Sequence, residues 1–168
     1  MKKIINIKKQ AGFNLIEVLL AFLILSIGLL GVAGLQTTAV KASQTAMLKS
    51  IAITKVSEMI ERIRANSAAA ITDYELALGT VGIDKGCDTR SATILATQCS
   101  PADLASNDLY QWEQSLTNGG LPDNTDTDAS IVIDDAAVPP IATITVYWKE
   151  RGENMSYFSK IQQIPGAN

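Results

Sequence analysis

One long apolar stretch near the N-terminus constrains this chain more than any other feature. From Phe13 to Val40 the only charged residue is Glu17. Phe13 to Leu35 covers 23 residues, and at about 1.5 Å per residue a helix of that length extends roughly 34 Å. Because the hydrocarbon core of a bilayer is about 30 Å thick, the stretch predicts a membrane-spanning helix.

Basic residues are concentrated before this stretch. The residues up to Gly12 include four lysines and no acid: Lys2, Lys3, Lys8 and Lys9. Positive charge holds one end of a span in the cytoplasm and sends the rest of the chain across. A carboxylate at mid-bilayer costs on the order of 2.5–3.5 kcal/mol. We therefore expect Glu17 to have a specific partner.

An ordinary secretory signal peptide is the alternative interpretation of the same residues. It has a basic start, an apolar centre and a small-x-small site at Gly31-Val32-Ala33, which would give a mature chain beginning at Gly34. The apolar run is long for a signal peptide, and it contains Glu17. Both features favour a helix that is retained.

The stretch "AGFNLIEVLLAFLIL" resembles the leader and N-terminus of type IV prepilins, with Gly12, Phe13 and Glu17 in the family's register. Asn14 stands where the commonest form of the motif has Thr. The resemblance implies that prepilin peptidase cuts between Gly12 and Phe13 and that the new amine of Phe13 is methylated.

The resemblance also implies a partner for Glu17. Cleavage leaves a positive amine on Phe13, and Glu17 of one subunit could pair with that amine on its neighbour in the filament. A matched pair removes much of the cost of a charge in a low-dielectric core. In the alternative, Glu17 extends to the lipid headgroups.

The following stretch, "LSIGLLGVAGLQ", is similar to PilV-type minor pilins, also called type IV pilus modification proteins. This resemblance implies a minor subunit that initiates or caps pilus assembly, with prepilin peptidase, other minor pilins, the major pilin and the inner-membrane assembly platform as partners. Membrane lipid would surround the helix before assembly. A minor pseudopilin of type II secretion is the first alternative, and an adhesin or DNA-uptake module is the second.

Four segments are expected along the chain. They are a leader (1–12), the membrane half of the N-terminal helix (13–35), its amphipathic half (36–70) and a periplasmic globular head (71–168). The amphipathic half is predicted from apolar residues at helical spacing that face the head: Leu48, Ala52, Val56, Met59 and Ile63.

The head contains both cysteines of the chain, Cys87 and Cys99. An oxidising periplasm favours a disulfide between them, and closing this loop contributes about 3 kcal/mol in the chain-entropy model. With no histidine in the chain, two cysteines at this spacing make a poor metal site, so we expect a structural disulfide.

Further along, the pattern changes from helix to sheet. Ser100 is expected to cap a helix that has Pro101 in its first turn and ends at Gly119-Gly120. Its expected apolar face consists of Ala105, Leu109, Trp112 and Leu116. Strands are expected at 130–133, 141–148 and 156–164. The sequence thus predicts an α+β pilin fold, with a long N-terminal helix packed on a small antiparallel sheet.

Other functions find less support. Asn124, Asp126, Asp128 and Asp135 are spaced like calcium-loop ligands, but Ala129 stands where that loop needs glycine, and a solvated acidic loop is preferred. No catalytic pair, phosphate loop or cofactor motif is recognised, so we expect neither an enzyme nor a bound cofactor. After Gly12 the chain has 10 basic and 17 acidic residues, which disfavours nucleic acid as a partner. The expected location is the inner membrane with a periplasmic head, then the pilus.

Overall fold

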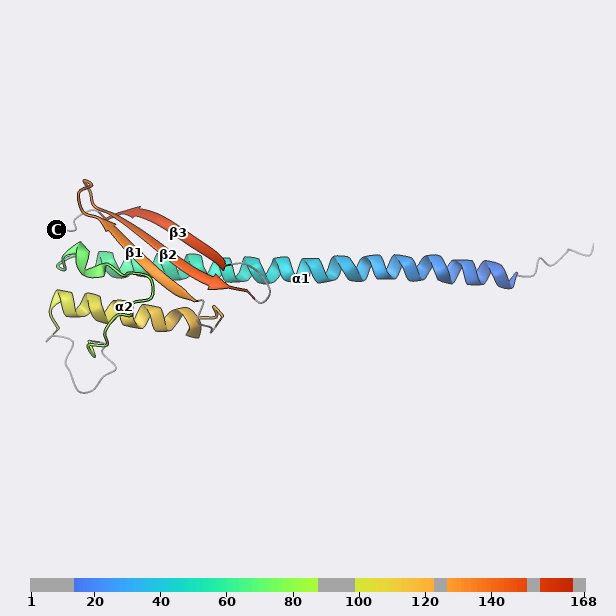
Figure 1. Cartoon of the computed structure of the whole chain (residues 1–168), viewed down its shortest axis with the longest axis horizontal. Helices are drawn as coiled ribbons and strands as arrows, with labels where there is room; N and C mark the ends of the chain where they lie inside the picture. Colours follow the sequence, from blue (N-terminus) through green and yellow to red (C-terminus); the bar gives the residue numbers. More distant parts are fainter. Residues whose placement is uncertain (1–13, 88–98, 123–126, 151–154, 165–168) are drawn as a thin grey trace, which may run out of the picture. The chain divides into compact units, whose positions relative to one another are not determined.

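The computed structural model describes residues 14–87, 99–122, 127–150 and 155–164 of the 168-residue chain. The chain divides into two units, Met1–Ser43 and Gln44–Asn168. Figure 1 shows the elements in chain order: helix α1 (Leu15–Ala65), 3-10 helix η1 (Ile71–Tyr74), helix α2 (Pro101–Asn118), and strands β1 (Asp128–Asp134), β2 (Ile141–Lys149) and β3 (Met155–Gln163).

The C-terminal part of α1 carries the buried stripe that the sequence predicted. Ala52, Val56, Met59 and Ile63 are buried, and Leu48 packs against them partly buried. Their spacing of three and four residues keeps them on one face of the helix. The helix ends at Ala65, five residues before the end of the expected segment 36–70.

Helix α2 begins and ends where its capping residues predicted. The Ser100 hydroxyl accepts a hydrogen bond from the backbone N–H of Asp103 at 3.1 Å, and Pro101 occupies the first turn. At the other end, the N–H of Gly119 donates to the carbonyl of Ser115 at 2.8 Å. The expected apolar face is buried: Ala105, Leu109, Trp112 and Leu116.

The three strands form one antiparallel sheet in the order β1-β2-β3. All three expected strands exist, and each extends one or two residues beyond a predicted boundary. Alternate residues of β1 and β2 face the core, which explains why β-branched and aromatic residues recur there. The inward side chains are those of Ala129, Ile131, Ile133, Ala142, Ile144, Val146 and Trp148.

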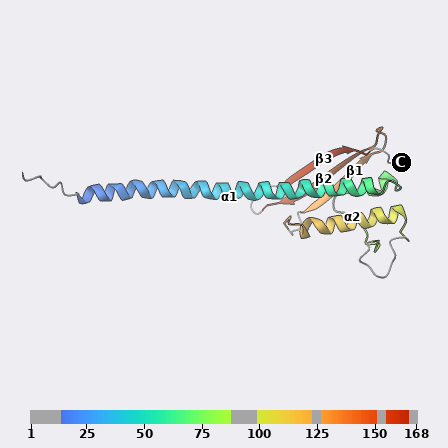
Figure 2. The same ribbon diagram turned by 180° about the vertical axis from the view of Figure 1, so that it is seen from behind.

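Within the unit Gln44–Asn168, the C-terminal part of α1 runs between the sheet and α2, both in Figure 1 and from behind in Figure 2. One hydrophobic core joins all three, with Trp112 and Trp148 its largest fully buried side chains. Trp112, which the sequence placed on the apolar face of this helix, is fully buried, and its indole N–H donates to the Lys55 carbonyl at 2.8 Å.

Two features of this core were not predicted. η1 buries Ile71 and Tyr74, and Leu76 forms an isolated antiparallel bridge with Ile131 of β1. Residues 71–76 thereby close the core beside the sheet, where the sequence had indicated only the start of a head.

Candidate functional site: the apolar N-terminal part of α1

Helix α1 begins at Leu15, so Glu17 lies in its first turn. The backbone N–H of Glu17 donates to the carbonyl of Asn14 at 2.9 Å, and its side chain is exposed. A carboxylate near a helix N-terminus is stabilised by the partial positive charge of the unpaired N–H groups. Gly12 and Phe13, the predicted cleavage and methylation sites, lie outside the described residues.

Apolar side chains surround this part of α1 on every side. Each large hydrophobic residue from Leu15 to Leu35 is between 40% and 76% exposed. Globular surfaces rarely expose an apolar area of this extent without a partner. The helix is also long and apolar enough to cross a membrane. Its side chains therefore require an apolar environment, either lipid or other helices.

The few hydroxyl groups near this surface are satisfied by the helix itself. Ser26 donates to the carbonyl of Phe22 at 2.7 Å, and Thr37 donates to the carbonyl of Gly34 at 2.8 Å. Bonds of this kind let hydroxyls enter an apolar environment without an unpaired donor. Among the described residues from 14 to 40, Glu17 is the one ionisable side chain.

Comparison with family models matches this region and the segment that follows it. Residues 7–33 match the prokaryotic N-terminal methylation motif, and residues 34–110 match the family described as type IV pilin Tt1218. The two matches adjoin and agree with the exposed apolar helix and the α+β head. The chain is a type IV pilin. Comparisons with curated proteins and with solved structures found no match.

The family is a structural one, without enzymatic activity. The methylation motif implies that prepilin peptidase processes the pilin. An apolar N-terminal helix is consistent with residence in the inner membrane and then in the pilus. The resemblance found in "AGFNLIEVLLAFLIL" is confirmed at the level of the type IV pilins; the minor-pilin subfamily is a finer assignment.

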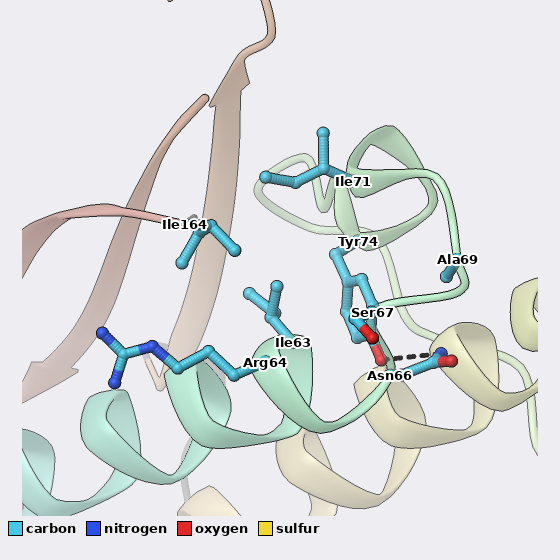
Figure 3. Close-up of a pocket in the computed structure, with 8 residues that line it drawn as sticks. All are labelled: Ile63, Arg64, Asn66, Ser67, Ala69, Ile71, Tyr74 and Ile164. Carbon is cyan, nitrogen blue, oxygen red and sulfur yellow. Dashed lines mark hydrogen bonds between the residues drawn. The ribbon is translucent and has the colours of Figure 1, made fainter. Parts of the chain in front are cut away.

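The head holds the C-terminal end of α1 through a polar network, part of which Figure 3 shows. The amide Nδ2 of Asn66, which is buried, donates to the Tyr74 hydroxyl at 3.0 Å. That hydroxyl donates in turn to Asp108 of α2 at 3.1 Å. Burial, followed by the Asp108 charge, raises the pKa of Tyr74, so the hydroxyl remains a donor.

Ion pairs extend the network along α1. Arg62 contacts Asp108 at 2.9 Å and Glu58 at 2.8 Å, and Lys55 contacts Glu58 at 3.1 Å. Burial opposes ionisation of Glu58, but the hydrogen bonds from Arg62 and Lys55 outweigh it and lower the pKa of Glu58. This network links α1 to α2 and to η1, and thus orients α2 on the long helix.

The predicted disulfide is present. Cys87 and Cys99 are joined, with their Cα atoms 6.0 Å apart. The N–H of Cys87 donates to the side-chain oxygen of Asn107 on α2 at 3.4 Å, and Cys99 immediately precedes the Ser100 cap. The bond therefore fixes the segment before Cys87 to the start of α2.

Strand β1 rules out the calcium-loop arrangement that the spacing of the acidic residues suggested. Asn124 and Asp126 lie outside the described residues, whereas Asp128 begins β1 and Asp135 follows its end. Six residue steps of strand, from Asp128 to Asp134, cover about 20 Å, and Asp135 follows in a turn. The two carboxylates thus cannot share one ion, and Asp128 is a strand residue rather than part of a solvated loop.

Sequence reasoning missed two groups of residues. Arg62, Tyr74 and Asp108 come from three elements, and nothing local in the sequence pairs them. Leu78, Val81 and Ile83 are large aliphatic residues, yet they are exposed in a segment without regular secondary structure. Their signal was available, because "LALGTVGID" places aliphatic residues among glycines without helical or strand periodicity.

Proposed function

We propose that this pilin is a PilV-type minor subunit that joins other minor pilins to initiate or cap pilus assembly. The similarity of "LSIGLLGVAGLQ" to that subfamily carries the proposal. This stretch overlaps the end of the methylation motif, in a helix whose apolar side chains need neighbouring helices once they leave the membrane. In this proposal the inner membrane holds the precursor by one span, with its head in the periplasm.

Processing occurs between Gly12 and Phe13 in this proposal, and Phe13 is methylated. Glu17 then pairs with the Phe13 amine of a neighbouring subunit and sets the register between them. Its place in the first turn of an otherwise uncharged stretch supports this role, since such a carboxylate needs a partner when lipid or helices enclose it.

Mass spectrometry of sheared pili tests the assignment. We expect this chain in small amounts relative to the major pilin, with a methylated Phe13 as its N-terminus. A mature chain that begins at Gly34 would contradict processing as a pilin.

Replacing the acid tests the pairing. Glu17→Leu should insert normally but enter sheared pili at least about tenfold less, because leaving a buried charge unpaired costs about 3–5 kcal/mol. Ser26→Ala, a polar change in the same apolar stretch, is the control and should be incorporated normally. Incorporation of Glu17→Leu at the control level would remove the pairing.

A minor pseudopilin of type II secretion is the competing function, because it would need the same leader and apolar helix. A deletion strain separates the two. Loss of surface pili with secretion intact supports the pilus subunit, whereas loss of secreted enzymes with pili intact supports the pseudopilin.

A further inference from the structure

The segment from Leu76 to Cys87 is held firmly against the head. Leu76 and Ile131 exchange two backbone hydrogen bonds of 3.0 and 2.9 Å. Gly82 lies so close to α2 that a Cβ there would collide with the backbone at Tyr110. Its N–H donates to a carboxylate oxygen of Glu113 at 2.8 Å. These contacts fix the path of the segment.

Although it is fixed, this segment exposes three large aliphatic side chains. Leu78, Val81 and Ile83 are 58%, 62% and 61% exposed. Single exposed aliphatic residues are ordinary, but three within six residues of a well-held segment concentrate exposed apolar surface, which typically marks an interaction site. We call Leu78, Val81 and Ile83 the aliphatic patch.

A hollow of about 320 Å³ lies beside the aliphatic patch, and Val81 belongs to both. Its described walls come from residues 79–81, from α2 and from the start of β1; they include the carboxylates of Glu113 and Asp128, and none of these described residues is basic. Asp128 accepts a hydrogen bond from the N–H of Gly79 at 2.8 Å. Burial raises the pKa of Glu113, and the charge of Asp128 raises it further. The hydrogen bond from the Gly82 N–H opposes this shift but does not cancel it.

We propose that the hollow and the aliphatic patch together form a docking site for a lysine or arginine side chain, set among apolar residues, on the head of a neighbouring pilin of a different kind. This inference rests on the proposed function. Charge complementarity selects the occupant, because half-buried carboxylates with no basic residue among the described walls of the hollow attract a cationic side chain, while the aliphatic patch buries its apolar surroundings.

A second copy of this chain is a poorer occupant. After Gly12 the chain carries 10 basic and 17 acidic residues, so two copies repel each other more strongly than this chain repels a less acidic subunit. Charge thus favours contact with a different protein over contact with a second copy, as expected of a minor subunit that assembles with different pilins.

Crosslinking in living cells tests the site in the full chain. A photo-crosslinking phenylalanine analogue replaces Val81, and mass spectrometry identifies the captured protein and residue. The same analogue in place of Ile161, which is exposed on β3, is the positional control. We expect Val81 to capture a different pilin beside a lysine or arginine, and Ile161 not to capture that residue.

Neutralising the hollow tests the charge. Glu113→Gln with Asp128→Asn keeps the side-chain oxygens that accept from Gly82 and Gly79, so the fold should persist. The crosslink from Val81 should fall about fivefold or more, the factor that corresponds to about 1 kcal/mol. Asp134→Asn with Asp135→Asn removes two exposed charges elsewhere and should leave it unchanged. Glu113→Arg, combined with a carboxylate at the captured basic residue, should restore it.

The outcomes separate the site from the proposed function. Three results would contradict the docking site: Val81 captures no pilin, it captures a second copy of this chain, or its crosslink is unchanged after the hollow is neutralised. If sheared pili nevertheless contain the chain, the minor-pilin assignment stands. If Val81 captures a basic side chain of a secretion-system pseudopilin, the pilus assignment fails together with the choice of partner.

Discussion

The two parts of α1 differ in how their hydrophobic and charged residues are arranged, although they belong to one continuous helix. In the unit that ends at Ser43, large hydrophobic residues are exposed all round the helix, and from Phe13 to Val40 Glu17 is the only charge. From Gln44 onward the hydrophobic residues are confined largely to one buried face, and charged residues occupy the others. The first part is therefore a surface that other molecules must cover, while the second is already covered by its own head.

Matched isoleucines on α1 give the largest expected contrast. Ile60 is 1% exposed and Ile24 is 69% exposed. Ile60→Ala should lower the free energy of unfolding of the head by about 2–5 kcal/mol, because it leaves a cavity in a packed core. Ile24→Ala should leave that free energy unchanged.

Urea denaturation of the full chain in detergent, followed by tryptophan fluorescence, measures both, since Trp112 and Trp148 are buried in the head. A loss of more than about 1 kcal/mol for Ile24→Ala would mean that the two parts of α1 are not energetically distinct.

Breaking the disulfide should affect the head alone. Replacing Cys87 and Cys99 by serine should cost about 3 kcal/mol of head stability. It should leave membrane insertion by the first part of α1 unchanged. A reductant should bring the unmodified chain to the same midpoint of denaturation, and a chain insensitive to reductant would contradict the role given to this bond.

A smaller effect is expected from the polar network. Tyr74→Phe removes a hydroxyl that accepts from Asn66 and donates to Asp108, and it should cost about 1 kcal/mol. Tyr157→Phe is the matched control, because Tyr157 is exposed on β3 and should be neutral. Equal thermal midpoints for the two variants would show that the network adds nothing to the attachment of α2.

The smallest effect concerns pH. The folded-state pKa of Glu58 is lowered from 4.5, so its stabilisation is present above pH 4.5 and is lost as pH falls through the folded pKa. Glu58→Gln should therefore flatten the decline of stability below that pH. The pKa of Glu113 is raised, chiefly by burial, so its ionised form disfavours folding. Glu113→Gln should thus stabilise the head at neutral pH; denaturation midpoints between pH 3 and 7 would show opposite signs for the two variants.

Local patterns predicted most elements of this fold. The stripe from Leu48 to Ile63, the Ser100 cap and the alternation in β2 each depend on residues close together in sequence. η1 was missed because Ile71 and Tyr74 are buried by partners distant in the chain. Arg62 and Asp108 were not paired for the same reason, since 46 residues separate them.

The functional site shows the same limit in another form. Glu17 could be singled out because one acid in an apolar stretch is a local anomaly. Its proposed partner, the Phe13 amine of another subunit, is not a contact within one chain. Glu113 gave no such local signal, and Asp128 stood out only by its calcium-loop spacing, because only folding brings the two to one hollow.

The disulfide also determines where this pilin can change without refolding. Cys87 is tied to α2 through Asn107, and Cys99 adjoins the capped start of that helix. Both ends of the intervening stretch are therefore anchored, and doubling the length of a closed loop costs only about 0.6 kcal/mol. Insertions between the cysteines should therefore be tolerated with little loss of stability. Related pilins can vary in length and sequence here while they keep the same core.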